Sequence, residues 1–288
     1  MAKALPTCLL NGTLMPISSA QVSPFDRGLL FGDGVYEVLP CYLGRPFRLQ
    51  AHFDRLQSGL DALGIRNPYP FARWTELIRA LALANGSGDL GIYLEITRGG
   101  EPGRDFLPEP GNTPTVFGFC WRLPFVRPGE LKGITAVTLE DIRWQRCDIK
   151  AIALLGPVML RTEAKRRDAD EAILIRDGRL AEGSSSAVFV VENGRITTPP
   201  ASHERLPSVT RLVVEDVLVA LGLPLRVREV NRDELQTADE IWVASSTREV
   251  MPVTTLDGHA VGTGKPGPIW RRVVEEYQAL REREADYD

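Results

Sequence analysis

The sequence contains few of the residues from which metal sites and disulfide frameworks are built. The four cysteines are scattered along the chain and include no CxxC pair: Cys8, Cys41, Cys120 and Cys147. The three histidines are equally isolated: His52, His203 and His259. Zinc sites and disulfide-rich domains place these residue types at short, regular spacings. We therefore expect neither a disulfide framework nor a metal site.

Long apolar runs and an excess of positive charge are also absent. No run approaches the roughly 20 apolar residues that a membrane-spanning helix needs, and the N-terminus lacks a signal-peptide core. The net charge of -4 leaves no basic stripe for nucleic acid. We expect a cytoplasmic protein without membrane or nucleic-acid partners, and 288 residues suffice for one large domain or two small ones.

Lysine is scarce, although positive charge is not. Only five of the 34 Lys and Arg residues are lysine, and one of them, Lys150, runs directly into the apolar segment 151–156. A cation there is costly unless it is paired or its pKa is lowered, and a desolvated lysine is a candidate amine nucleophile. The alternative is a boundary lysine that extends its ammonium group to water.

The first half of the chain mixes helices with a sheet. Apolar alternation and turn signals predict strands at 7–10, 35–42, 46–49, 92–96 and 115–121. Apolar residues on one face predict helices from Gln50 to Leu63, followed by Gly64 as a C-terminal cap, and from Phe71 to Leu83. The Gly- and Pro-rich stretch 99–111 is expected to be a surface loop.

Two prolines and a glycine at 122–129 indicate a domain boundary, which gives an N-terminal α/β domain at 1–123 and a C-terminal domain at 124–288. In the second domain we expect strands at 133–139, 171–176, 187–191, 196–198, 225–229, 240–244 and 250–256. Helices are expected at 153–167, 210–221 and from Pro268 to about Glu284.

Three stretches of the second half could carry chemistry. Glu182 precedes Gly183 and three serines, so that a carboxylate enters an apolar strand beside small residues. The segment 206–211 begins a helix with Ser208 as a plausible N-cap, and first-turn amides suit a phosphate. Hydroxyl residues 245–247 end an apolar strand and form a second possible phosphate cradle. Each could equally be a solvated turn or an ordinary helix start.

A lysine amine, a buried acid and two phosphate-type turns together are what pyridoxal 5'-phosphate requires. The chain resembles the class IV, fold type IV pyridoxal-phosphate aminotransferases, most closely the D-amino acid transaminases. The resemblance runs from Gly12 to the last helix and rests on specific motifs: Asp26-Arg27-Gly28 with 31–38, the segment 52–56, the segment 141–150, and 182–186. It implies an α+β or α/β fold with a small N-terminal domain and a larger pseudo-barrel C-terminal domain that binds the cofactor.

The resemblance also assigns roles to residues. Lys150 would be the Schiff-base lysine and the acid and base that moves the substrate α-proton, and Glu182 would hold the pyridine nitrogen. The remaining cofactor contacts would come from Arg55, Ser185, Leu206, Val209, Thr210 and Ser246. Tyr36 and Arg104 would bind the substrate carboxylate. Such enzymes are homodimers with the active site between the two domains and close to the partner subunit.

The substrate loop departs from the D-amino acid transaminase pattern. Arg104 matches the family arginine only across a one-residue length change, and Phe106 stands where a histidine is expected. Leu39-Pro40-Cys41 also lacks a lysine that the best-known members carry. The leading hypothesis is transfer between a D-amino acid such as D-alanine and a 2-oxo acid such as 2-oxoglutarate. The alternatives are a branched-chain L-aminotransferase, an (R)-amine transaminase, an aminodeoxychorismate lyase, or a cofactor-binding protein without turnover.

Overall fold

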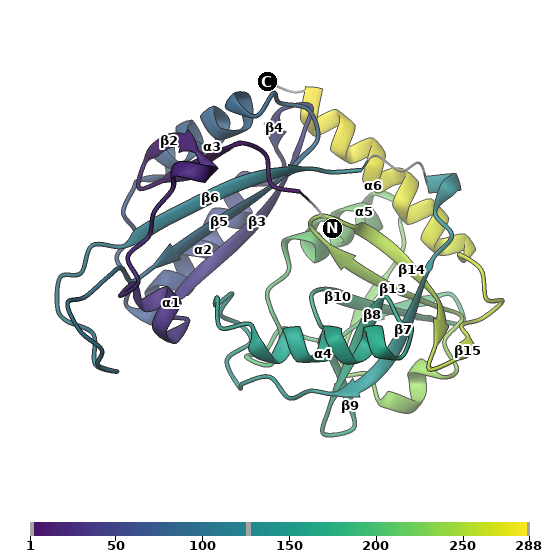
Figure 1. The fold of residues 1–288 in the computed structure, drawn as a ribbon. Helices are drawn as coiled ribbons and strands as arrows, with labels where there is room; N and C mark the ends of the chain where they lie inside the picture. The colour runs from purple at the N-terminus through teal and green to yellow at the C-terminus, as the bar shows by residue number, and fades with distance from the viewer. Residues whose placement is uncertain (1–2, 125–127, 287–288) are drawn as a thin grey trace. The chain divides into compact units, whose positions relative to one another are not determined.

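The computed structural model describes residues 3–124 and 128–286, and the chain divides into two compact units (Figure 1). The first unit comprises Met1–Phe125, Ile149–Leu154 and Glu284–Asp288, and the second comprises Val126–Asp148 and Leu155–Arg283. The domain boundary predicted at 122–129 falls partly on 125–127, which lie outside the described residues. The short segment that carries Lys150 thus groups with the first unit. No helix in the described ranges is long and apolar enough to cross a membrane.

The first unit is built on a six-stranded antiparallel sheet in the order β2-β1-β6-β5-β3-β4. Its strands are β1 Thr7–Leu10, β2 Thr13–Pro16, β3 Gly34–Tyr42, β4 Arg45–Pro46, β5 Leu90–Thr97 and β6 Thr115–Arg122. Its helices are α1 Arg27–Phe31, α2 Leu49–Leu63 and α3 Phe71–Ala84. α2 and α3 pack on the sheet, and Leu60, Trp74 and Ile78 are completely buried in the shared core.

The second unit contains a mixed nine-stranded sheet in the order β12-β11-β10-β13-β14-β7-β8-β9, with β15 paired to β14. Its strands are β7 Ile134–Glu140, β8 Glu171–Arg176, β9 Arg179–Gly183, β10 Ala187–Glu192, β11 Arg195–Thr198, β12 Leu225–Val227, β13 Glu240–Ser245, β14 Glu249–Leu256 and β15 His259–Ala260. Its helices are α4 Leu155–Arg166, α5 Val209–Ala220 and α6 Pro268–Asp286. Three single-turn 3-10 helices complete the described elements: η1 Ile17–Ser19, η2 Pro128–Glu130 and η3 Arg232–Leu235.

Most elements expected from the sequence are confirmed, including the α2 cap, where Gly64 adopts the left-handed conformation with φ 62°. One predicted strand was wrong. The strand expected at 46–49 is only Arg45–Pro46, because α2 already begins at Leu49. The elements that were missed include the short helix α1 and the strands β9 and β15. β9 has no apolar alternation, and it forms because the turn at Asp177-Gly178 folds it back onto β8.

Candidate active site

Lys150 lies on the segment Ile149–Leu154, which runs beside β3 within the first unit. The N–H of Tyr36 donates to the carbonyl of Lys150 over 2.9 Å, and the N–H of Ile152 donates to the carbonyl of Gly34 over 3.1 Å. The lysine is half-buried, and its Nζ lies 4.2 Å from the centroid of the Tyr36 ring. The structure thus brings together two of the predicted site residues, Lys150 and Tyr36.

Tyr36 and Glu37 are adjacent on β3 and make contacts on opposite faces of the sheet, because successive side chains of a strand point to opposite faces. Tyr36 stacks on Tyr93 of β5, with ring centroids 5.7 Å apart. Glu37 is buried and contacts residues of α2 instead. A charged residue in a core-facing position between Val35 and Leu39 is the sequence signal that a buried partner exists.

That partner is Arg55, the predicted phosphate-binding arginine. Arg55 Nε and Nη2 donate to the two Glu37 carboxylate oxygens, each over 2.7 Å, and His52 Nδ1 lies 2.8 Å from the same carboxylate. Burial alone would raise the pKa of Glu37, but Arg55 and His52 outweigh it and hold that pKa well below its usual range. Burial also lowers the pKa of His52, which favours the neutral ring. Glu37 therefore fixes the plane of the Arg55 guanidinium.

Glu182 lies on β9 of the second unit and is buried. Arg143 Nη1 lies 2.5 Å from one carboxylate oxygen, and the N–H of Leu206 donates to the other over 3.1 Å. Arg143 is in turn paired with Asp141 over 2.9 Å. Burial raises the pKa of Glu182, and the Arg143 charge opposes this rise only in part. The structure thus joins two more predicted residues, Glu182 and Leu206.

A second buried acid, Glu171 at the start of β8, links two of the predicted cofactor segments. It accepts hydrogen bonds from Ser184 and Ser186, which flank the exposed Ser185, and it pairs with Arg248. Arg248 follows Ser246 in the turn after β13. The carboxylate is completely inaccessible to solvent. Glu171 was not singled out from the sequence, where it reads as an ordinary strand-edge acid after Asp170.

The start of α5 is a capped helix N-terminus, as the sequence predicted. Ser208 is the N-cap and its side chain accepts from the N–H of Arg211 over 3.1 Å. Val209 and Thr210 follow in the first turn, and both are buried. Leu206, just before the helix, is half-buried.

Arg104 belongs to the first unit and lies on the exposed loop between β5 and β6. Its guanidinium lies 5.0 Å from the ring centroid of Phe31 and 5.3 Å from that of Phe106. Phe106 itself is 78% exposed. Among the described residues, Arg104 makes no contact with Tyr36, the other predicted carboxylate-binding residue.

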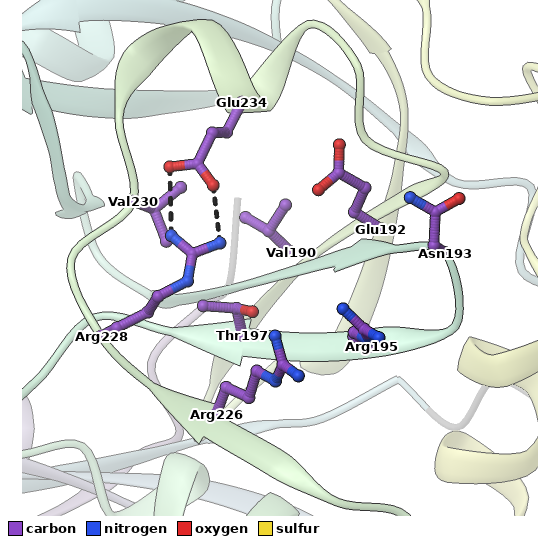
Figure 2. A pocket seen from close by; sticks show the side chains of 9 residues that line it. All are labelled: Val190, Glu192, Asn193, Arg195, Thr197, Arg226, Arg228, Val230 and Glu234. Atoms are coloured by element: carbon purple, nitrogen blue, oxygen red, sulfur yellow. Dashed lines mark hydrogen bonds and ion pairs between the residues drawn. The ribbon is translucent and has the colours of Figure 1, made fainter.

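The predicted cofactor residues do not line the pocket drawn in Figure 2, which lies on the second unit. Its floor and walls come from β10, β11, β12 and η3, and Arg228 donates to the carboxylate of Glu234 over 2.6 and 3.1 Å. Within the described ranges, no group of three or more His, Cys, Asp or Glu residues is placed to hold a metal ion.

Comparison with known proteins points to one family. The family model of amino-transferase class IV matches residues 34–256. The chain is 40% identical to the D-alanine aminotransferase of Bacillus licheniformis, and the match covers 94% of this chain and 95% of the relative. It is 35% identical to the D-alanine aminotransferase of Staphylococcus epidermidis, and that match covers 93% of this chain and 95% of the relative. Among solved structures, a branched-chain amino acid aminotransferase from T.th., solved with pyridoxamine 5'-phosphate, superposes with a TM-score of 0.91 at 26% identity, covering 99% of this chain and 98% of that one.

Proposed function

The chain belongs to the class IV aminotransferases, and from that premise we propose that it moves an amino group between a D-amino acid such as D-alanine and a 2-oxo acid such as 2-oxoglutarate. The choice of a D-amino acid is supported by the 40% identity with a D-alanine aminotransferase over 94% of the chain. The fold and the cofactor expected from the sequence are confirmed, because the chain is a fold type IV enzyme that uses pyridoxal 5'-phosphate.

The donor set of the chain fits this cofactor, which when bound supplies an electron-withdrawing ring to the substrate carbon that loses its proton. We assign the ring nitrogen to Glu182, because a buried carboxylate interacts strongly with a nearby cationic N–H. We assign the ring face to Leu206. The phosphate would be held by the arginine, first-turn and hydroxyl residues suited to it: Arg55, Val209, Thr210, Ser185 and Ser246.

Lys150 is proposed to hold the cofactor and to move the proton at the substrate α-carbon. A general acid or base must lie within hydrogen-bond reach of that proton. The backbone of Lys150 is fixed to β3 by its hydrogen bond with Tyr36, while its side chain is only half-buried and can extend. Tyr36 and Arg104 are proposed to bind the substrate carboxylate.

A second substrate class is favoured by one observation. The position at which a D-amino acid transaminase is expected to carry a histidine is Phe106, which cannot donate a hydrogen bond to a carboxylate. An (R)-amine carries no carboxylate and would not need such a donor. A branched-chain L-amino acid, or the substrate of an aminodeoxychorismate lyase, carries a carboxylate like D-alanine and would have to bind it through other residues.

We also propose a cytoplasmic homodimer. The compartment is supported by the four cysteines, which are all free and buried, as is usual where thiols stay reduced. The dimer is supported by the exposed apolar side chains of the substrate loop, Phe106 and Leu107, at 78% and 79% exposure.

The test is a half-reaction without amino acceptor. Purified protein that carries cofactor is mixed with D-alanine or L-alanine, and the visible absorbance band of the lysine-bound cofactor is followed. We expect conversion to the pyridoxamine form with D-alanine alone. Conversion by L-alanine, or by neither isomer, would move the assignment to one of the alternative substrates. Lys150→Ala, which removes the amine, should abolish the conversion.

A further inference from the structure

Arg27, in the Asp26-Arg27-Gly28 motif, occupies a buried position for which the proposed function leaves no role. Arg27 is 3% exposed and begins the short helix α1. A buried guanidinium is tolerated only when its donors are paired. The contacts that satisfy it therefore indicate what it does.

The motif fixes Arg27 to the sheet of the first unit. Asp26 caps α1 by accepting from the N–H of Gly28 over 2.8 Å and also accepts from the hydroxyl of Thr115 over 2.6 Å. A Cβ at position 28 would lie 2.3 Å from the methyl group of Thr97, so only glycine fits there. The backbone that carries Arg27 is thus held against β5 and β6.

From this base the guanidinium reaches the loop between β5 and β6. It pairs with Glu101 over 3.0 Å and donates to the backbone carbonyls of Asp105 over 2.7 Å and Phe106 over 2.9 Å. Glu101 in turn accepts from the N–H of Glu109 over 2.9 Å. One ion pair therefore fixes the backbone on both sides of the loop tip, which is otherwise exposed and without regular structure.

The fixed carbonyls directly follow Arg104. The ring of Phe31 joins the two arginines, with the Arg27 guanidinium 4.7 Å and the Arg104 guanidinium 5.0 Å from its centroid. Phe31 also contacts Phe106 over 5.5 Å between centroids. The backbone and the side chain of Arg104 are therefore both held by contacts that lead back to Arg27.

We propose that Arg27 is a positioning residue for substrate recognition: it holds the 101–109 loop in the one conformation in which Arg104 presents its charge to the substrate carboxylate. This inference rests on the proposed role of Arg104. A loop that is ordered before binding loses less conformational entropy when the substrate arrives, so the tether lowers KM. Arg27 takes no part in the chemical step, so its substitution should leave kcat nearly unchanged.

A matched control separates this role from a purely structural one. Arg27 also pairs with Asp33 over 2.8 Å. Arg98 pairs with the same carboxylate over 2.8 Å and donates to the carbonyl of Leu63, but among the described residues no hydrogen bond or ion pair joins it to the 101–109 loop. Arg27 and Arg98 thus share Asp33 as a partner and differ in the loop. Arg27→Lys keeps a charge for Asp33 and Glu101 but cannot donate to both carbonyls at once. Arg98→Lys makes the same chemical change away from the loop.

The experiment is a double-mutant cycle on the cofactor-loaded enzyme with Arg27→Lys, Arg104→Ala and both together. We expect Arg27→Lys to raise KM for the amino and the 2-oxo acid about tenfold, the size of one lost charge-assisted hydrogen bond, with kcat within about twofold. In the Arg104→Ala background the same change should raise KM no further. Arg98→Lys should leave KM unchanged. Additive effects, or an equal effect of Arg98→Lys, would overturn the proposal.

The test of the Arg27 tether must not depend on the folding of one variant or on the assigned substrate. Hydrogen exchange of the amides at 103–109 should quicken in Arg27→Lys but not in Arg98→Lys, and unchanged exchange would contradict the tether. If Arg27→Lys fails to fold, Glu101→Gln loosens the same pair and should give the same pattern with a smaller effect. The cycle is run with whichever amino acid the wild type converts, so a wrong substrate assignment shows first as a missing D-alanine half-reaction.

Discussion

Glu37 and Arg55 form a two-point ion pair, with both hydrogen bonds 2.7 Å long, across the contact between β3 and α2. The pair orients the arginine that we assign to the cofactor phosphate. A charge-assisted pair with two parallel hydrogen bonds sets direction as well as energy. With Arg55 in its proposed role, Glu37 would link the sheet to cofactor binding through the arginine.

Glu37→Gln should weaken cofactor binding, because an amide can no longer hold both Arg55 nitrogens. We expect the dissociation constant for pyridoxal 5'-phosphate to rise about tenfold, measured by titrating the cofactor-free protein. Asp54→Asn is the control, since it removes one negative charge from α2 at an exposed position bonded to Gln50. Equal affinities of the two variants would refute the orienting role.

The same carboxylate predicts a pH dependence of stability. The pKa of Glu37 is lowered in the folded protein, because Arg55 and His52 outweigh the burial that would raise it. Such a group contributes stability above its unfolded pKa of about 4.3, and this contribution is lost as the pH falls below that value. The Tm difference between wild type and Glu37→Gln should be full at pH 7 and shrink below about pH 4. A difference that stays constant with pH would exclude Glu37 as the source.

Phe106→His tests the substrate loop. If this side chain sets affinity for the substrate carboxylate, a histidine donor should lower KM for D-alanine about threefold to tenfold, the range of one hydrogen bond. Leu83→His is the control, because Leu83 is 73% exposed and lies near the end of α3, outside the substrate loop. An unchanged KM in Phe106→His, or the same decrease in both variants, would remove Phe106 from the specificity determinants.

The four cysteines should be unreactive in the native protein. All are buried, and burial raises the pKa of Cys41 and of Cys120 to about 12 and also raises the pKa of Cys8 and Cys147. The thiolate is the reactive form, so at pH 8 little of it is present. Ellman's reagent should therefore label the native protein slowly and titrate four thiols after unfolding in guanidinium chloride. A rapidly labelled thiol in the native protein would contradict the burial described.

Apolar periodicity was enough to predict the helices around Leu60 and Trp74, because both residues face a single core and propensity agrees with packing. It was not enough for β9, whose residues carry no alternation. There the turn at Asp177-Gly178 and the ladder with β8 decide the structure. Pairing between strands is a property of two segments, so one segment read alone does not contain it.

The candidate site, too, was predicted only in part from the sequence. Lys150 and Glu182 stand out because a lysine or an acid beside an apolar run is chemically costly. Arg143, Glu37 and Glu171 were not singled out, although each holds a predicted residue or the segment next to it. Their partners Glu182, Arg55 and Ser184 lie 39, 18 and 13 residues away, so only the folded chain brings each pair together.

Glu182 should give the opposite pH dependence of stability. Its pKa is raised in the folded protein by burial, with Arg143 opposing only part of the effect. A carboxyl with a raised folded pKa favours folding at pH values below its unfolded pKa, and this contribution is lost as the pH rises through the folded pKa. At pH 7 the charged form therefore weakens the cofactor-free protein. Glu182→Gln should raise the Tm of that protein at pH 7, and the gain should shrink toward pH 4.

The same variant should lose catalysis, because an amide cannot stabilise a protonated ring nitrogen. We expect kcat to fall on the order of a hundredfold, as when one electrostatic partner of a developing charge is removed. A gain in stability with a loss of turnover separates a functional acid from a structural one, since a structural acid would lose both. Glu171→Gln is the comparison: this carboxylate holds Arg248 and two serines, so its removal should lower Tm. A lower Tm in Glu182→Gln as well would mean that Glu182 mainly holds Arg143 in place.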